Sequence, residues 1–508
     1  MKHLLERIGG FIPSLVALTL PVISLPIASD SYILPRASIV IAGASLGIGL
    51  ALLLPISPGL GALRLPLVAA AAAAALAFVF SISWPLSLAG SFTRYESLPM
   101  RLGYLGLAAS AVWPLRTRVQ QDAVGVAFVV GTSIVAFKAW LQWFFHAPFR
   151  PDGDLGNANL LAALIVMAIP IAIDRGRRSP YLTPAWAVAI VVMLAGLVVT
   201  TSRSGALGLL AGALTVVALS VPPRFLRAAA GLAVAAFAAA VVFILASPLR
   251  ALNDDPPQLR LHLWQDAVRM IGARPITGWG EDTTGLAFGH FLSQDYAGLV
   301  TFDRVHSGVL EIAATQGIVG LAALTWVLFV LGRGTWRGRL EPGVPGLAGA
   351  LVGYSVWVFF NFDWAPATGP FWLLAGTLWS VAGCPLPNGE RVRERGVSWR
   401  QPLALVLALV AIPTAVFPVL ADVWYLRGRP DLSVRVDPLQ AQYHWALGTV
   451  PELQRAADLG ETDPSMYVQL GDGYAKVGNR AQAVRAYERA LEIDPFYSPA
   501  RQRLSALG

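Results

Sequence analysis

Long apolar stretches separated by short polar segments recur along most of the chain. Most of them are long enough to cross the ~30 Å hydrocarbon core of a bilayer as a helix. The runs are continuous rather than alternating, which favours helices over a transmembrane β-barrel. The pattern therefore predicts an all-α polytopic membrane protein of 12–13 transmembrane helices, of which the fourth is short and interrupted by polar residues. The thirteen runs lie near residues 11–29, 37–56, 65–83, 102–115, 123–144, 158–173, 185–200, 205–221, 228–247, 308–332, 346–361, 367–383 and 402–423.

Composition and charge agree with this interpretation and add an orientation. Of the 508 residues, 56% are apolar and 13% are charged, whereas soluble proteins have about 25% charged residues. Cytoplasmic loops are enriched in Lys and Arg, so the distribution of these residues predicts a cytoplasmic N-terminus and, with thirteen spans, an outer C-terminus. The predicted inner segments contain Lys2, Arg7, Arg64, Arg116, Arg118, Arg175, Arg177, Arg178, Arg224, Arg227, Arg333, Arg337, Arg339, Arg391, Arg393, Arg395 and Arg400. The short outer loops contain only Arg36, Arg94, Arg101, Arg150 and Arg203.

The charge distribution and the cysteine content disfavour nucleic-acid binding and cysteine-based disulfide or metal sites. The net charge of +8 comes mostly from the basic residues of the predicted cytoplasmic loops, which set the orientation in the membrane. Nucleic-acid binding would instead need a basic face on a soluble domain. The sole cysteine, Cys384, rules out an intrachain disulfide and a multi-cysteine metal site.

Arg203 lies in a very tight outer connection, within "LVVTTSRSGALG". A cation so close to hydrocarbon is costly unless it pairs or reaches water. It could extend to lipid headgroup phosphates. Alternatively, it could bind an anionic substrate, with the hydroxyl groups of Thr200, Thr201, Ser202 and Ser204 as further donors, since guanidinium groups bind phosphate oxygens well.

One outer loop is much longer than the others, at about 248–307, and such loops are usually functional. Within it, "LRLHLWQDAVRMIGA" has helical periodicity. We expect "RPITGWG" to end that helix. The predicted apolar stripe consists of Leu261, Trp264, Ala267, Val268 and Ile271.

His306 follows Asp303 and Arg304 at the end of this loop, where the tenth run begins. A histidine at a helix start can be a capping or packing residue. Imidazole is also the side chain whose ordinary pKa suits proton transfer near neutral pH. Glu311, about one turn into the helix, could orient His306 or be an interfacial carboxylate.

The segments "TTSRSGALGLLAG", "RLHLWQDAVRMIGARPITGWG" and "VHSGVLEIAATQGIVGLAAL", in this order, resemble the bacterial O-antigen ligase/polymerase superfamily. The segments "GSFTRYESLPMRLGYL" and "RPDGDLGNANLLAALIVMAIP" also resemble parts of that family. The resemblance implies a metal-independent enzyme without cofactors in the bacterial inner membrane. It would transfer a glycan from undecaprenyl pyrophosphate to a hydroxyl acceptor on the outer face. It further implies that Arg203 and Arg260 engage the pyrophosphate and that His306 acts as base or positions the acceptor, with Arg304, Arg150 and Asn157 as supporting residues.

General chemistry agrees with these implied roles, because fixed cations can stabilise a departing pyrophosphate without a metal. The acidic segments "PDGD" at 151–154 and "NDDPP" at 253–257 do not have the spacing or setting of a metal-dependent transferase site. The same donor chemistry would serve a polymerase that adds repeat units, which is the main alternative. A transporter of lipid-linked glycan is a third hypothesis, but it predicts polar residues scattered within the spans, where Lys138 is the only clear cation.

The composition changes after the thirteenth run, which separates a membrane domain, 1–424, from a hydrophilic tail, 425–508. Residues 464–497 match a tetratricopeptide repeat, with packing positions at Tyr467, Leu470, Gly471, Tyr474, Gly478, Ala483, Tyr487, Ala490 and Pro495. A degenerate repeat precedes it. Stable solenoids need about three repeats, so we expect the tail to rest on the membrane domain, on another subunit or on a protein partner.

Overall fold

The computed structural model describes residues 10–53, 59–112, 115, 117–146, 150–246, 257–296, 302–382 and 400–507. Within these residues the chain is helical and contains no strand, which confirms the all-α polytopic fold. Cys384 and most of the "NDDPP" segment lie outside the described residues.

Each of the thirteen apolar runs coincides with a helix. These helices are α2 (Ile12–Val22), α3 (Ile33–Leu53), α4 (Arg64–Val79), α6 (Leu98–Val112), α7 (Arg118–His146), α8 (Ala158–Arg178), α9 (Thr183–Thr200), α10 (Arg203–Ser220), α11 (Leu226–Ala246), α14 (Gly308–Arg337), α15 (Val344–Phe359), α16 (Ala365–Ala382) and α17 (Arg400–Leu426). In the described residues, eight helices are long and apolar enough to cross a membrane. Helix α2, at 11 residues, is shorter than the run that predicted it.

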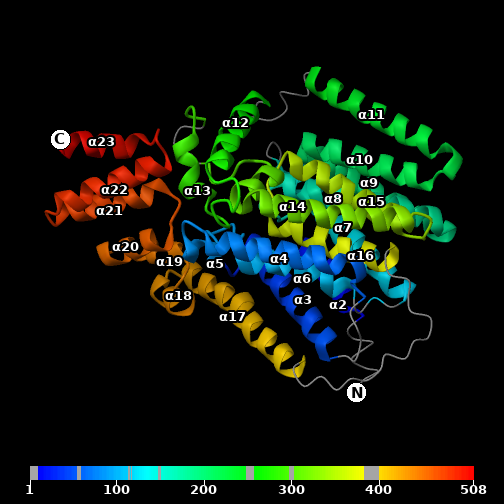
Figure 1. Ribbon diagram of the computed structural model, residues 1–508, viewed down its shortest axis with the longest axis horizontal. Helices are drawn as coiled ribbons and strands as arrows, with labels where there is room; N and C mark the ends of the chain where they lie inside the picture. The colour runs from blue at the N-terminus through cyan, green and yellow to red at the C-terminus, as the bar shows by residue number, and fades with distance from the viewer. Residues whose placement is uncertain are drawn as a thin grey trace.

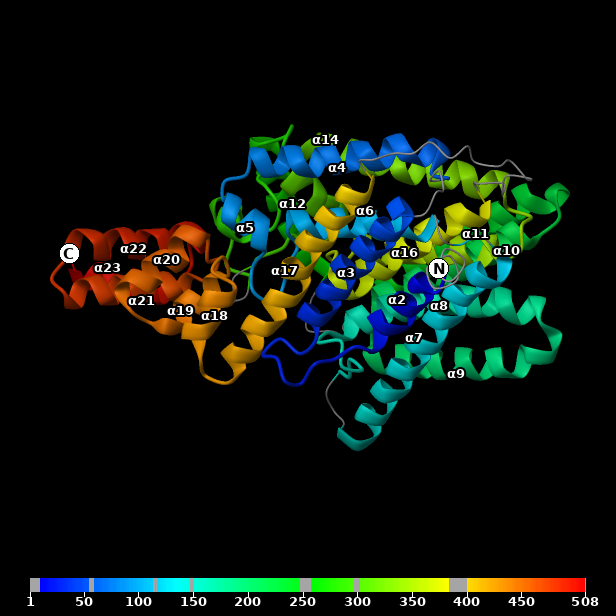
Figure 2. The same cartoon turned by 90° about the horizontal axis from the view of Figure 1, so that it is seen from below.

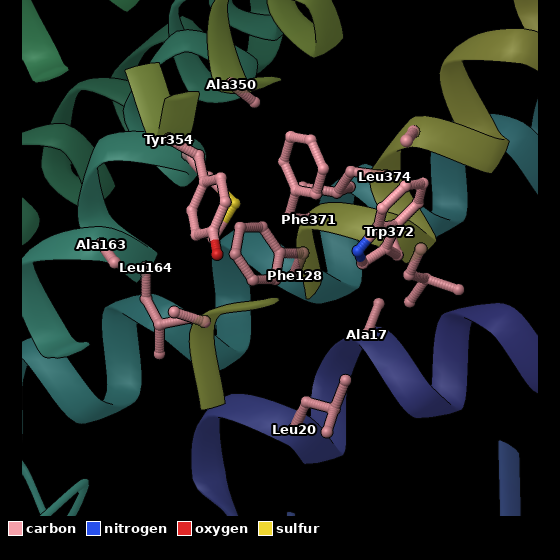
Figure 3. Packing of buried hydrophobic residues seen from close by; sticks show 14 of the residues in the cluster. Ala17, Leu20, Phe128, Ala163, Leu164, Ala350, Tyr354, Phe371, Trp372 and Leu374 are labelled. Atoms are coloured by element: carbon pink, nitrogen blue, oxygen red, sulfur yellow. The ribbon is translucent and has the colours of Figure 1, made fainter. Parts of the chain in front are cut away.

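Helix α8 lies at the centre of the bundle. Its residues from Leu160 to Pro170 are all buried, and they pack against α7, α9, α10 and α15 (Figures 1 and 2). Figure 3 shows part of this core, where the ring of Tyr354 on α15 stacks on that of Phe371 on α16, with ring centroids 4.6 Å apart. Apolar burial on all sides explains why α8 has an almost continuous run of aliphatic residues.

Helices α10 and α15 approach closely through two pairs of glycines spaced four residues apart. A Cβ atom at Gly208 would lie 2.7 Å from the backbone oxygen of Gly353, and one at Gly212 would lie 2.7 Å from that of Gly349. Small residues at this spacing allow helices in membranes to pack backbone to backbone. The sequence "SGALGLLAGAL" therefore fixes α10, and with it Arg203, against α15.

The segment that follows α12 (Pro257–Ala273) inserts into a kink in α14. Gly317 has a φ of +65° within α14, and a Cβ atom there would lie 2.2 Å from the backbone oxygen of Ile276. The backbone amides of Trp279 and Gly280 donate to the carbonyls of Ala314 and Thr315, at 2.9 and 3.0 Å. This docking holds the long loop that precedes α14 against the first part of that helix, close to His306.

The buried face of α12 differs from the predicted stripe. Leu263, Ala267 and Met270 are buried, whereas Leu261 and Val268 are 56% and 58% exposed. Ala267 was predicted correctly, and Trp264 and Ile271 are half-buried. The helix packs through positions 263, 267 and 270, which form an i, i+4, i+7 face, because that face meets the short helices α13 (Thr284–Ala287) and η5 (Phe288–Phe291).

The tail consists of six helices beyond α17. They are α18 (Pro430–Val436), α19 (Ala441–Leu447), α20 (Val450–Leu459), α21 (Pro464–Lys476), α22 (Arg480–Ile493) and α23 (Ser498–Leu507). They extend from the end of the bundle where α5 (Trp84–Ala89), α12 and α13 lie (Figure 1). Leu86 of α5 and Leu286 of α13 belong to the same buried apolar cluster as the tail. The tail therefore rests on the membrane domain of its own chain.

Candidate active site

Arg203 begins helix α10 directly after a tight turn. Thr201 ends α9 in the left-handed conformation, with a φ of 52°. Ser202 is the N-cap of α10, and its Oγ accepts a hydrogen bond of 3.2 Å from the amide of Gly205. Ser and Thr are favoured at such caps because their oxygens satisfy free backbone amides. The turn leaves the half-buried Arg203 at a helix N-terminus, a position that favours anions.

Arg150 and Asn157 lie beside this turn. The Nε of Arg150 donates to the carbonyl oxygen of Thr200 at 3.0 Å, and its Nη2 donates to Oδ1 of Asn159 at 3.2 Å. Asn157 caps helix α8 and accepts from the amide of Asn159 at 2.8 Å. The structure thus brings Arg150 and Asn157 next to the segment that carries Ser202 and Arg203.

The loop between α15 and α16, residues 360–364, connects the segments of the remaining predicted residues. Arg260 of α12 donates through Nη1 to the carbonyl oxygen of Phe360 at 2.5 Å. The amide nitrogen of the Asn361 side chain donates to Oγ of Ser204 at 2.9 Å. The backbone oxygen of Asn361 accepts from the amide of Gly308 at 2.7 Å. One short loop therefore contacts α12 at Arg260, α10 beside Arg203, and α14 beside His306.

His306 lies half-buried between two aromatic rings. Its ring centroid is 5.6 Å from that of Phe302 and 5.5 Å from that of Phe362 in the same loop. Its backbone has a φ of 54°, which is unusual for a residue other than glycine. Hydrogen bonds on both sides hold this conformation, because Val305 donates its amide to Oε2 of Glu311 at 3.0 Å and Gly308 donates to Asn361.

Arg304 is bound by carboxylates and is only 1% exposed. Its Nη1 donates to Oε1 of Glu311 at 3.1 Å, and its Nη2 pairs with Asp282. Although burial opposes the charge, these two carboxylates raise the pKa of Arg304. This guanidinium fixes the long loop to α14 and presents almost no surface to a substrate. Glu311 likewise contacts the backbone of Val305 and the Oγ1 of Thr284 (2.6 Å).

A second group of ion pairs involves Asp303, which precedes His306, and Asp363 of the 360–364 loop. Arg94 pairs with Asp303, with 2.6 Å between Nε and Oδ2, and its guanidinium lies 4.4 Å from the ring centroid of Trp364. Despite burial, Arg94 lowers the pKa of Asp303. Arg101 pairs with Asp363 and, at 3.0 Å, with Glu281.

From the sequence, Arg94 and Arg101 stand out only as outer arginines and Asp303 only as a neighbour of His306, whereas Glu281, Asp363 and Asn361 were missed. The signal available for Asn361 and Asp363 was the short polar segment "NFDW" between two apolar runs. In the described part of the chain, no group of three or more His, Cys, Asp or Glu residues could hold a metal ion.

Residues 188–325 match the family model described as O-antigen ligase. No curated protein matches the chain. The matched segment extends from α9 into α14 and includes Ser202, Arg203, Arg260, Arg304 and His306, whereas Arg150 and Asn157 precede it. The similarity to the O-antigen ligase family therefore covers residues 188–325, the part of the chain that carries most of the predicted site residues.

Proposed function

We propose that the protein transfers a glycan from undecaprenyl pyrophosphate to a hydroxyl acceptor on the outer face of the bacterial inner membrane. The family match supports a membrane glycosyltransferase of the O-antigen ligase or polymerase type. The observation that carries the proposal is the convergence of the Arg203, Arg260 and His306 segments on residues 360–364.

In the proposed reaction, His306 accepts the proton of the acceptor hydroxyl as its oxygen attacks the anomeric carbon. The bond between that carbon and the pyrophosphate oxygen breaks, and its electrons remain on the pyrophosphate. Arg203 and Arg260 stabilise the charge that develops there, with Arg150 and Ser202 as neighbouring donors. One direct displacement inverts the anomeric centre. Asn157 and Arg304 hold neighbouring segments in place, since Asn157 caps α8 and Arg304 is buried among carboxylates.

The test is transfer in vitro from a defined undecaprenyl-pyrophosphate glycan, with purified His306→Ala and Arg203→Ala variants. We expect each to lose about a hundredfold or more in rate, as is typical for loss of a general base or of transition-state charge stabilisation. His290→Ala and Arg333→Ala are matched controls, because both side chains are exposed and lie outside the convergence. Unchanged turnover in both site variants would reject the assignment.

A metal-independent reaction keeps its rate in EDTA. Loss of transfer in EDTA with recovery on added Mg²⁺ would contradict this part of the proposal.

A polymerase remains the second candidate, because the same donor chemistry serves both reactions. A deletion strain separates them. Long lipid-linked polymer that stays unattached indicates a ligase, whereas single lipid-linked repeat units indicate a polymerase. A transporter is less favoured, because Lys138, the cation within the predicted spans, forms an ion pair with Asp154 in the structure.

A further inference from the structure

A narrow groove of about 140 Å³ runs along one face of α14, beginning beside the candidate active site. Val309, Ile312, Gln316, Gly320, Leu324 and Leu328 line it at helical spacing. From Val309 to Leu328 there are 19 steps of 1.5 Å, which in a straight helix span about 28 Å, close to the thickness of the hydrocarbon core. The opposite walls come from α4, α6, α15 and α16, and most of them are apolar. The groove therefore has the dimensions and the surface of a site for a single hydrocarbon chain.

One end of the groove is polar and contains two unsatisfied atoms. Arg101 and Asp363 line this end, and their side chains are 8% and 6% exposed. They pair through Nη1 and Oδ2. Among the described residues, Nη2 of Arg101 and Oδ1 of Asp363 have no hydrogen-bond partner. Buried polar atoms without partners are rare and costly. A hydroxyl group would satisfy both, since it can donate to the carboxylate and accept from the guanidinium.

The charge around this end disfavours an anionic ligand. Arg101 is surrounded by three carboxyl groups, those of Glu96 (3.8 Å), Glu281 (3.0 Å) and Asp363. Gln316 of the groove is also engaged, because its Nε2 donates to Glu281 at 2.6 Å. By contrast, the arginines proposed to bind or lie near the pyrophosphate, which are Arg203, Arg150 and Arg260, are not among the residues that line the groove. A phosphate would have to compete with Glu281 and Asp363 for the single guanidinium and would lie beside both carboxyl groups, whereas an uncharged hydroxyl would not be repelled.

We propose that this groove binds the acceptor, and that the acceptor is an uncharged lipid with a hydroxyl head. Its hydrocarbon chain lies along α14 and its hydroxyl lies between Arg101 and Asp363. The location fits transfer, because Asp363 follows Phe362, whose ring contacts His306, and Gly308 of the groove follows His306 by two residues. The acceptor role rests on the proposed function, whereas the binding of such a lipid does not.

The test is photolabelling of the full-length protein in lipid nanodiscs with a diazirine-bearing C16 alcohol, mapped by mass spectrometry. We expect labels on α14 between Ile312 and Leu328 and on the facing part of α4. Unlabelled hexadecanol should compete, and hexadecyl phosphate should compete at least tenfold less well. Labelling spread evenly over all spans, or equal competition by the phosphate, would overturn the proposal; the second result would assign the groove to an anionic lipid.

A matched pair of variants locates the label. Leu324→Trp fills the groove, and we expect it to reduce labelling at least fivefold. Ile318→Trp places the same side chain on the exposed face of α14, where Ile318 is 56% exposed, and should leave labelling unchanged. Equal labelling of both variants would show that the alcohol binds elsewhere.

Transfer assays separate this inference from the proposed function. If the protein glycosylates water-soluble acceptors but does not bind the alcohol, the groove proposal fails and the transferase stands. If the alcohol labels the groove but no donor glycan is transferred to any acceptor, the lipid site stands and the transferase proposal fails.

Discussion

At the residue scale, the candidate site is supported by charged side chains that hold one another in place. Arg304 lies between Asp282 and Glu311, and all three are buried. Removing one partner from such a pair leaves an uncompensated buried charge, which costs about 3–5 kcal/mol. These ions keep His306 in its left-handed backbone conformation, since Glu311 also accepts the amide of Val305. We therefore assign Arg304 a positioning role rather than direct contact with the substrate.

Glu96 should make the stability of the protein depend on pH. Burial raises the pKa of this carboxyl group from 4.5 to about 8, which the nearby Arg101 only partly offsets. Between these two values the folded protein keeps the proton and the unfolded chain loses it. Stability therefore falls as pH rises through this window, by about 1.4 kcal/mol per pH unit, and levels off above pH 8.

The measurement is denaturant unfolding of wild type and Glu96→Gln in detergent from pH 5 to pH 9. The variant keeps an oxygen that can accept the hydrogen bond from Tyr104 (2.5 Å), but it has no group to titrate. We expect the wild type to lose stability relative to the variant as pH rises toward 8. Parallel curves across the range would contradict the prediction.

At the element scale, the helices could be predicted from the sequence, but the contacts between them could not. Each apolar run became a helix because the backbone must satisfy its hydrogen bonds internally in lipid. The sequence predicted the tight turn at Thr201 and Ser202. It did not show which other segments this turn would contact. The loop at 360–364 was missed because its partners, Arg260, Ser204 and Gly308, lie between 53 and 157 residues away in the chain. The buried face of α12 differs from the predicted one because several apolar residues on that helix compete for burial.

Asn361 should couple the Arg203 turn to His306. Its side chain donates to Ser204, and its backbone accepts from Gly308. Asn361→Ala should reduce kcat by about tenfold to a hundredfold with a donor KM within threefold of wild type, because small displacements of reacting groups carry such penalties. Steady-state transfer kinetics with varied donor measure both constants.

A double-mutant cycle tests whether the hydrogen bond carries this effect. Ser204→Ala should resemble Asn361→Ala, and the double variant should be no slower than the slower single variant. Thr335→Ala is the control, since its Oγ1 donates to Leu331 within α14 (2.8 Å). If the fold-losses in kcat of the two single variants multiply in the double variant, the two residues act independently and the coupling is contradicted. An effect confined to the donor KM would also contradict it.

At the scale of the whole molecule, the tail packs against the long loop that precedes α14. Helices α21 and α22, which lie in the segment predicted to form a tetratricopeptide repeat, pack closely, since a Cβ atom at Gly471 would lie 2.4 Å from the ring of Tyr487. A Cβ atom at Gly289 in η5 would lie 2.1 Å from the backbone oxygen of Ile493 in α22. The segment from Glu281 to Phe291 thus contacts Arg101 and Arg304 at one end and the tail at the other.

This arrangement predicts that a single methyl group at position 289 loosens the tail. In Gly289→Ala the new atom would meet backbone, which cannot move aside as a side chain can, and overpacking of this kind costs about 1–3 kcal/mol. Limited proteolysis of the protein in nanodiscs, followed by the rate of cleavage between α17 and α23, measures the change. We expect cleavage to accelerate about fivefold or more.

Gly272→Ala is the matched control, because its Cβ atom would meet nothing within 4 Å. If both variants are cleaved at the wild-type rate, the tail does not depend on this contact. If cleavage accelerates while transfer is also slowed, the tail stabilises the loop that carries Asp282 and thereby supports the position of His306 through Arg304.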